Sequence, residues 1–159
     1  MHPTVARVVF AAEVAGLTIE PVEFAEKTRT AEEAAHAIGV EVGQIVKSLV
    51  FVLGDEVIVA LVSGSNRLDG AALAEAAGKP GTKVGRPDAD AVRTATGYAI
   101  GGIPPFGHAE SIPTFVDEDL LQYALVWAAA GTPNHNFAIK PSELVRVSGG
   151  TVCRLAERS

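Results

Sequence analysis

The segment with the clearest chemical potential is the octapeptide Gly-Gly-Ile-Pro-Pro-Phe-Gly-His at residues 101–108. Glycine adopts backbone angles that other residues avoid or lets a ligand approach the main chain, whereas proline fixes φ and removes an N–H donor. The segment therefore interrupts any helix or central strand and holds N–H and C=O groups in a fixed arrangement. Such an arrangement suits an oxyanion hole or a ligand collar; the alternative is an ordinary rigid connection between two strands.

His108 closes this loop with a titratable imidazole. An imidazole can serve there as a general base, and a structural role is the alternative. If a substrate carbonyl approaches the backbone, a Cβ at Gly101 or Gly102 intrudes on the reacting volume and lowers turnover. We expect the fold to survive alanine at either position, because a surface loop tolerates such a change better than a core does.

Lys47 is the second candidate, because it interrupts the most apolar stretch of the chain, residues 45–51. Period-two alternation places Lys47 on one face with Leu49 and Phe51. Its ammonium group must either extend to the edge of the sheet or point into a cleft where an anion or a carbonyl oxygen requires it. We expect it to face a cleft near residues 101–105.

Small residues mark two further regions that could border a binding site. Ser63 opens a strand-to-helix junction rich in hydroxyl groups, for which a capped helix start is the alternative. The strand predicted at 125–129 leads into three alanines and Gly131, and such small side chains either leave room for a ligand or allow close packing. His135 would lie just beyond that strand, in a loop.

The composition excludes several classes of function. A net charge of −6 over 159 residues argues against broad binding to a nucleic-acid backbone, and so against a DNA-binding role. One cysteine and four histidines without metal-ligand spacing predict neither a disulfide nor a metal site. Gly-rich phosphate loops, the His-Glu-x-x-His zinc motif and the Gly-x-Ser-x-Gly serine elbow do not occur. No apolar run is long enough to cross a bilayer, and residues 1–17 do not resemble a secretory signal, so we expect a cytoplasmic protein without membrane contacts.

The predicted elements indicate a mixed α/β fold, a single domain over residues 1–159 with a largely β core and peripheral helices. Capping residues and helical periodicity predict helices over residues 4–15, 30–39, 69–77 and 88–96, with a short helical turn at 141–144. Strands are predicted at 45–53, 57–62, 114–117, 125–129 and 137–140, with an extended segment at 18–24 and only weak structure after Gly149. The first two strands form a hairpin, and their Val, Ile and Leu content is typical of strands covered on both faces. The order of the strands does not follow from the sequence.

Five segments together resemble the YbaK family of aminoacyl-tRNA deacylases, which is related to the editing domain inserted in bacterial prolyl-tRNA synthetases. The matching stretches are Thr-Ala-Glu-Glu-Ala-Ala-His-Ala-Ile-Gly at 30–39, Gln-Ile-Val-Lys-Ser-Leu-Val-Phe at 44–51, Thr-Gly-Tyr at 96–98 with Gly-Gly-Ile-Pro-Pro at 101–105, Pro-Thr-Phe-Val-Asp at 113–117, and Ala-Ala-Ala-Gly at 128–131. They follow the family's order over roughly residues 18–148, and five matches in order are far more specific than any one alone.

The resemblance implies a trans-acting enzyme that hydrolyses the ester bond of tRNA mischarged with a small amino acid and so protects translation fidelity. It implies the 3′ end of mischarged tRNA as the substrate, a prolyl-tRNA synthetase as a candidate partner, and no cofactor or metal. By the same resemblance, Lys47 and the loop from Gly101 to Pro105 form the pocket for the terminal aminoacyl-adenosine. Gly131 to His135 matches a Gly-x-x-x-His spacing of members that edit alanine. Pro104 departs from the small hydroxyl residue that many members carry.

An aminoacyl ester is already activated, so a positioned water and stabilisation of the tetrahedral oxyanion are the main requirements. We assign catalytic roles to Lys47, Gly101, Gly102 and His108. The residues predicted to bind the substrate and limit the size of its amino acid are Ile103, Pro104, Pro105, Phe106, Ser63, Ala129, Ala130, Gly131 and His135.

Two other functions are compatible with these residues. A non-catalytic module of the same fold would bind a nucleotide or an aminoacyl-adenosine without turnover. An unrelated small-ester hydrolase would use His108 as its base and ignore tRNA. Which small amino acid is removed, Cys, Ala, Ser or another, does not follow from the sequence.

Overall fold

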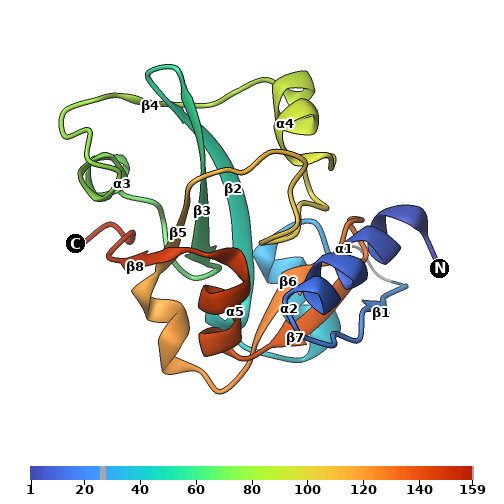
Figure 1. Cartoon of the computed structure of the whole chain (residues 1–159). Helices are drawn as coiled ribbons and strands as arrows, with labels where there is room; N and C mark the ends of the chain where they lie inside the picture. Colours follow the sequence, from blue (N-terminus) through green and yellow to red (C-terminus); the bar gives the residue numbers. More distant parts are fainter. Residues whose placement is uncertain (26–27, 159) are drawn as a thin grey trace.

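The computed structural model describes residues 1–25 and 28–158 and has the predicted mixed α/β fold, with sheets at the centre and helices around them (Figure 1). The helices are α1 (Pro3–Val14), α2 (Ala31–Ile38), α3 (Gly70–Ala76), α4 (Ala89–Thr96) and α5 (Pro141–Ser148), with short 3-10 helices at Val42–Gln44 and Glu118–Gln122. The strands are β1 (Val22–Glu23), β2 (Val46–Leu53), β3 (Glu56–Ser63), β4 (Val84–Gly85), β5 (Thr114–Asp117), β6 (Val126–Ala129), β7 (His135–Ile139) and β8 (Thr151–Cys153). None of the helices in the described part of the chain is long and apolar enough to span a membrane.

The strands form two sheets. The larger has the order β4-β2-β3-β5-β8, and the smaller has the order β1-β7-β6. β2 and β3 make the predicted antiparallel hairpin, in which Val46 faces Ser63 and Leu53 faces Glu56. β5 lies parallel to β3, and β8 lies parallel to β5. A bridge between Ile45 and Trp127 connects the two sheets next to the start of β2.

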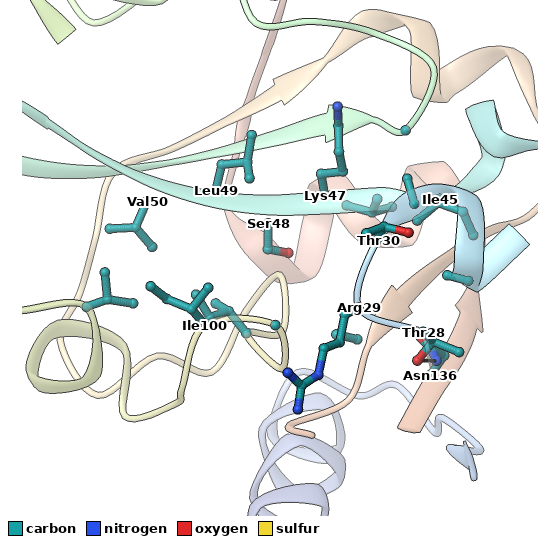
Figure 2. Close-up of a pocket in the computed structure, with 18 of the residues that line it drawn as sticks. Thr28, Arg29, Thr30, Ile45, Lys47, Ser48, Leu49, Val50, Ile100 and Asn136 are labelled. Atoms are coloured by element: carbon teal, nitrogen blue, oxygen red, sulfur yellow. Dashed lines mark hydrogen bonds between the residues drawn. The ribbon is translucent and has the colours of Figure 1, made fainter. Parts of the chain in front are cut away.

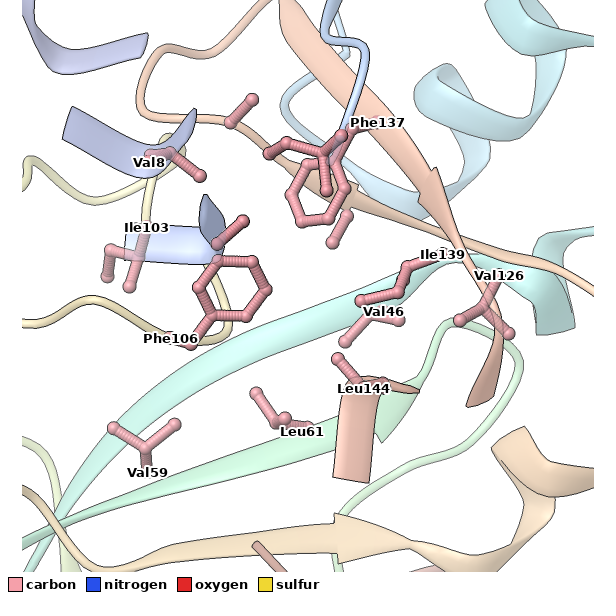
Figure 3. Close-up of a cluster of buried hydrophobic side chains, with 14 of the residues drawn as sticks. Val8, Val46, Val59, Leu61, Ile103, Phe106, Val126, Phe137, Ile139 and Leu144 are labelled. Atoms are coloured by element: carbon pink, nitrogen blue, oxygen red, sulfur yellow. The ribbon is translucent and has the colours of Figure 1, made fainter. Parts of the chain in front are cut away.

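Both faces of the hairpin are covered, as its unbroken apolar sequence predicts. On one face, Val46 and Val50 belong to a core cluster with Val8 of α1 and residues of the smaller sheet (Figure 3). On the other face, Phe51 packs in a cluster that includes Leu73 of α3. Figure 1 accordingly shows α3 on one side of β2 and β3, and α1 with the smaller sheet on the other. Polar side chains on β2 must therefore lie where one of these layers leaves a gap.

Side-chain caps fix the predicted helix starts. Thr30 Oγ1 accepts the N–H of Glu33 at 3.1 Å, and Glu33 Oε1 accepts the N–H of Thr30 at 3.3 Å, which is the expected capping box of α2. The side chains of Asp69 and Asp88 likewise accept a backbone N–H at the starts of α3 and α4. These caps set where α2 and α4 begin, and the first turns of both helices border the site described below.

The C-terminal region differs from the prediction. In place of a short turn at 141–144, α5 continues to Ser148 and ends at Gly149, whose φ of +66° suits a left-handed helix cap. The tail then forms β8, whose Thr151 and Val152 are exposed. β8 pairs with β5 through backbone hydrogen bonds, so its side chains need no alternating apolar pattern. The sequence therefore gives little indication of this strand. Likewise, only Val22–Glu23 of the extended segment at 18–24 pairs as a strand.

Candidate functional site

A cavity of about 400 Å³ lies along the free edge of β2. Among the described residues this edge is free, because β4 pairs with Val52 and Leu53 alone and the smaller sheet reaches the beginning of the strand only at Ile45. The walls come from the start of α2, from β2, from the residues before α4, from the 101–108 loop and from the smaller sheet (Figure 2). Segments far apart in the sequence therefore meet around one strand edge.

The structure brings some of the predicted site residues together here and places the others elsewhere. Lys47, Gly101, Ile103 and Ala129 line the cavity. The remaining predicted residues lie in the core, in a polar network behind Lys47, or in separate grooves: Gly102, Pro104, Pro105, Phe106, Ser63, Ala130, Gly131, His108 and His135.

Lys47 does not extend towards the Gly/Pro loop, which differs from the expected orientation. Its Nζ donates a hydrogen bond of 2.6 Å to the backbone oxygen of Asn66, in the turn after β3. Figure 2 shows Lys47 and Ser48 leaving β2 on opposite sides, with Ser48 on the side of Ile100. Alternation along β2 explains the difference, because the side chains next in line to Lys47 are the ones that face the loop.

A buried carboxylate anchors the turn to which Lys47 binds. Asp117 has no exposed surface, and its Oδ2 accepts the N–H of Ser63 at 3.0 Å and Nδ2 of Asn66 at 2.9 Å. Asn66 Nδ2 also reaches Asp119 Oδ2 at 2.7 Å. Asn66 is thereby held in place, and its carbonyl oxygen fixes the Lys47 ammonium group. Ser63 belongs to this network and has no place in the cavity wall.

The environment of Lys47 combines partial burial with two nearby carboxylates. Partial burial lowers the pKa of Lys47 from its ordinary value, and the negative charges of Glu32 and Asp117 oppose that shift. A partly desolvated ammonium group interacts with a nearby anion more strongly than a solvated one does, because the local dielectric is lower. Lys47 lines the cavity, and Asn66 holds its ammonium group on the side of β2 away from the loop.

Two arginines that were not among the predicted site residues also line the cavity, Arg29 and Arg86. The sequence placed both in a basic stretch that could form either a narrow mouth or a solvated surface. Both are exposed, and the Arg86 guanidinium lies 5.3 Å from the centre of the Phe51 ring. Arg29 directly precedes the cap of α2, and Arg86 stands two residues before the cap of α4. A basic residue just ahead of a capped helix is the signal that could have identified them.

The Gly/Pro loop is buried, so the expectation of a tolerant surface loop is wrong. Residues 102–106 are all buried, and Phe106 packs edge-on against Phe137 with ring centres 5.7 Å apart. A Cβ on Gly102 would lie 2.9 Å from Cα of Thr132, which is too close for any real contact. The N–H of Gly102 donates to the Ala99 oxygen, and its oxygen accepts the N–H of Gly131. The backbone of Gly102 is therefore committed to the fold, whereas Gly101, with a φ of +96°, borders the cavity.

His108 lies in a different groove, between α1 and the loop, with Phe106 and Val147. Its Nε2 and the oxygen of Pro104 are 2.7 Å apart, so Nε2 carries the proton of that hydrogen bond. This geometry favours the structural role that the sequence left open.

The stability of the protein should fall on acidification because of His108. Burial lowers the pKa of His108 below 6.5, with partial opposition from the bond to Pro104. Below that pH, His108 is protonated in the unfolded chain but stays neutral in the folded chain. The free energy of unfolding therefore decreases as pH falls, by at most about 1.4 kcal/mol per pH unit for this one proton. Melting curves between about pH 7.5 and pH 5.5 should show a shallower decrease for His108→Gln, which keeps a donor for Pro104 but does not titrate. An unchanged slope in His108→Gln, or an equal change in a variant of the exposed His36, would contradict the prediction.

Gly131 lies in the turn before β7, next to α1, and His135 is the first residue of β7 rather than part of a loop as expected. A Cβ on Gly131, whose φ is +98°, would lie 2.7 Å from the Thr4 oxygen, so the small residue permits close packing of α1. His135 Nδ1 is 2.6 Å from Thr132 Oγ1, and its Nε2 is 3.5 Å from a carboxylate oxygen of Glu23. These residues border a second, more open pocket, separated from the main cavity by the contact between Gly102 and Gly131.

The cavity thus combines a fixed lysine, two rim arginines, a sharply turned glycine and an apolar wall. In residues 1–25 and 28–158, no group of three or more His, Cys, Asp or Glu side chains is arranged to hold a metal ion. The arrangement can bind a phosphate-bearing ligand by charge and enclose a small apolar or weakly polar group beside it.

Comparisons with known proteins agree with this picture. A family model described as an aminoacyl-tRNA editing domain matches residues 25–147. The chain is 33% identical over 127 residues to the uncharacterised protein YwhH of Bacillus subtilis (strain 168), covering 79% of each chain. It is 31% identical over 140 residues to EbsC of Enterococcus faecalis (strain ATCC 700802 / V583), named as a Cys-tRNA(Pro)/Cys-tRNA(Cys) deacylase, covering 86% of this chain and 84% of EbsC. A crystal structure described as a trans-editing enzyme for prolyl-tRNA synthetase superposes with a TM-score of 0.92 and 46% identity, over 99% of both chains.

Proposed function

From the premise that this chain belongs to the aminoacyl-tRNA editing domain family, we propose that it acts in trans on tRNA carrying a wrong, small amino acid. The broader assignment, a hydrolase of aminoacyl-tRNA esters, rests on the family and on the similarity to EbsC and to the trans-editing enzyme. The finer assignment concerns the size of the amino acid and the way the substrate arrives.

The observation that carries the proposal is that Lys47, Gly101 and two arginines border one cavity of about 400 Å³. That volume lies in the range of ordinary ligand pockets, which is roughly 300–1,000 Å³. A terminal nucleotide with its ester-linked amino acid presents a phosphate, a sugar and a small side chain. Arg29, Arg86 and Lys47 suit the phosphate, and the apolar wall suits a side chain of limited size.

The reaction needs little from the protein beyond position and charge. The aminoacyl ester is already activated, so hydrolysis requires a water molecule held near the carbonyl carbon and stabilisation of the oxyanion that forms. In the proposal, Gly101 and Ile103 guide the ester along the loop, because both border the cavity. Lys47 holds the terminal phosphate, since its ammonium group lies on the side of β2 away from the loop that guides the ester. Gly102 supports the loop, since both of its backbone groups are occupied.

A second hydrolytic site has a clear purpose in the cell. A synthetase pocket distinguishes amino acids that differ by one small group by only about 1–3 kcal/mol, so wrong esters form and must be removed. The neighbour described as a trans-editing enzyme for prolyl-tRNA synthetase makes that synthetase the first partner to test. The proposed place of action is the cytoplasm, where tRNA is charged.

A deacylation screen tests the proposal directly. The purified chain is mixed with tRNA charged separately with cysteine, alanine, serine or proline, and the release of free amino acid is compared with release in buffer alone. We expect faster release for at least one small, mismatched amino acid and little for correctly charged prolyl-tRNA. If no ester is cleaved faster than in buffer while the charged tRNA still binds, the non-catalytic binding module is the better description. Cleavage of simple esters that is insensitive to tRNA would favour a general hydrolase.

A further inference from the structure

The hydroxyl group of Ser48 is buried in the wall of the cavity. Its Oγ is buried and has no hydrogen-bond partner among the residues that the structure describes. A buried polar atom without a partner costs free energy, because it has given up water and gained nothing in return. An alanine would fit the same space without that cost, so the position calls for an explanation.

The surroundings of Ser48 are apolar and face the cavity. Its neighbours on the same side of β2, Val46 and Val50, line the cavity, as do Ile100 and Ile103 of the loop. Figure 2 shows the Ser48 side chain extending from β2 on the side of Ile100. The hydroxyl is therefore one hydrogen-bonding atom set in an apolar wall.

The charged groups of the cavity lie elsewhere. Arg29 and Arg86 are exposed at the rim, and Lys47 points away from Ser48 on the other side of β2. A phosphate-bearing part of a ligand is drawn to these cations. The wall around Ser48 is then left for an uncharged part of the ligand, since an ionised group would lose its hydration there without a partner of opposite charge.

We propose that Ser48 Oγ forms a hydrogen bond with the side chain of the bound amino acid and so determines which ester is preferred. The inference rests on the proposed function and adds a specificity-determining residue to it. A substrate side chain that ends in a hydroxyl or thiol group pairs with Ser48, whereas an alanyl ester leaves Ser48 unpaired in the complex. A site built to pair with a hydroxyl discriminates against the analogue that lacks it. The chain therefore prefers seryl or cysteinyl esters over alanyl esters.

The test compares Ser48→Ala with the unaltered chain on one tRNA charged with serine, cysteine or alanine. We expect the preference of the unaltered chain for the seryl or cysteinyl ester, measured as a ratio of kcat/KM values, to fall about ten-fold in Ser48→Ala. The loss should come from slower cleavage of the preferred ester, with the alanyl ester cleaved at least as fast as before. The melting temperature should stay constant or rise, because Oγ has no partner to lose.

Two serine variants serve as controls. Ser111 is exposed, so Ser111→Ala should change neither the preference nor the melting temperature. Ser63 Oγ is buried like that of Ser48 but donates to the Gly43 oxygen at 2.7 Å, so Ser63→Ala should lower the melting temperature. The contrast between Ser48 and Ser63 separates an unpaired hydroxyl from a structural one.

An equal loss for all three esters would overturn the proposal, because the hydroxyl would then contact a part common to every substrate, such as the ribose. Unchanged ratios would overturn it as well. If the unaltered chain cleaves none of the esters, the proposed function fails separately, and Ser48 is then tested by binding. Titrations with amide-linked, non-hydrolysable seryl- and alanyl-adenosine should still show a difference in affinity that Ser48→Ala removes; equal affinities would reject the role of Ser48.

Discussion

Replacing Lys47 with alanine is expected to lower the deacylation rate by roughly 10- to 100-fold, because a hydrogen bond to a charged group such as the substrate phosphate contributes about 1.5–3 kcal/mol. The fold should tolerate the change. Burial of the Lys47 ammonium is unfavourable, as its lowered pKa indicates, so its removal relieves a cost while it gives up one bond to Asn66. Single-turnover rates and melting curves measure the two effects separately.

Lys79→Ala is the matched control for that experiment. Lys79 also makes one electrostatic contact, 3.5 Å from Glu56, but its side chain is 41% exposed and does not line the cavity. We expect Lys79→Ala to keep the full deacylation rate. A large decrease in melting temperature for Lys47→Ala, with a normal rate per folded molecule, would show that Lys47 has a structural function only.

Alanine at Gly102 should be the most damaging small change in the loop. The added Cβ would lie 2.9 Å from both the backbone nitrogen and Cα of Thr132, so either the loop or the β6–β7 turn has to move. Such overpacking costs typically about 1–3 kcal/mol. We expect a clear decrease in melting temperature together with a lower deacylation rate, because the same movement displaces Gly101 and Ile103. A variant with an unchanged melting temperature would contradict the packing argument.

Gly101→Ala and Gly149→Ala serve as a matched pair for the same measurements. Both glycines have positive φ, +96° and +66°, and a Cβ meets nothing closer than 3.9 Å at either position. Backbone strain of roughly 1–2 kcal/mol should therefore lower both melting temperatures to a similar extent. Only Gly101 borders the cavity, so only Gly101→Ala should also slow deacylation, by about ten-fold or more. Equal activity in the two variants would mean that the loop is only a connection.

Local signals predicted most elements of the fold. The capping box at Thr30, the caps at Asp69 and Asp88, and the apolar hairpin depend on neighbours in the sequence, and each is confirmed in the structure. α5 was underestimated although Val145 and Val147 continue its apolar face to the residues just before Gly149, where the helix ends. β8 was missed because backbone pairing with a distant strand leaves no mark on its side chains.

The site was harder to predict, because it is formed by tertiary packing. Alternation placed Lys47 and Ser48 on opposite faces of β2, but the sequence could not tell which face meets the loop. That choice depends on where α1 and the smaller sheet pack. The position of Arg29 and Arg86 just before two capped helices is a weak signal, because it does not show that the starts of these helices converge on one strand edge.

The position of β5 has a consequence for the order in which the protein is made. β5 lies between β3 and β8 and is parallel to both, and one of these neighbours is the last strand to be synthesised among the described residues. While the ribosome has yet to release residues 151–153, one edge of β5 has no neighbour, and an open strand edge is a template for unwanted association. The nascent chain therefore passes through an interval in which the hairpin and its helices can already pack but the sheet is unfinished. Protection of this edge of β5 therefore depends on the synthesis of β8.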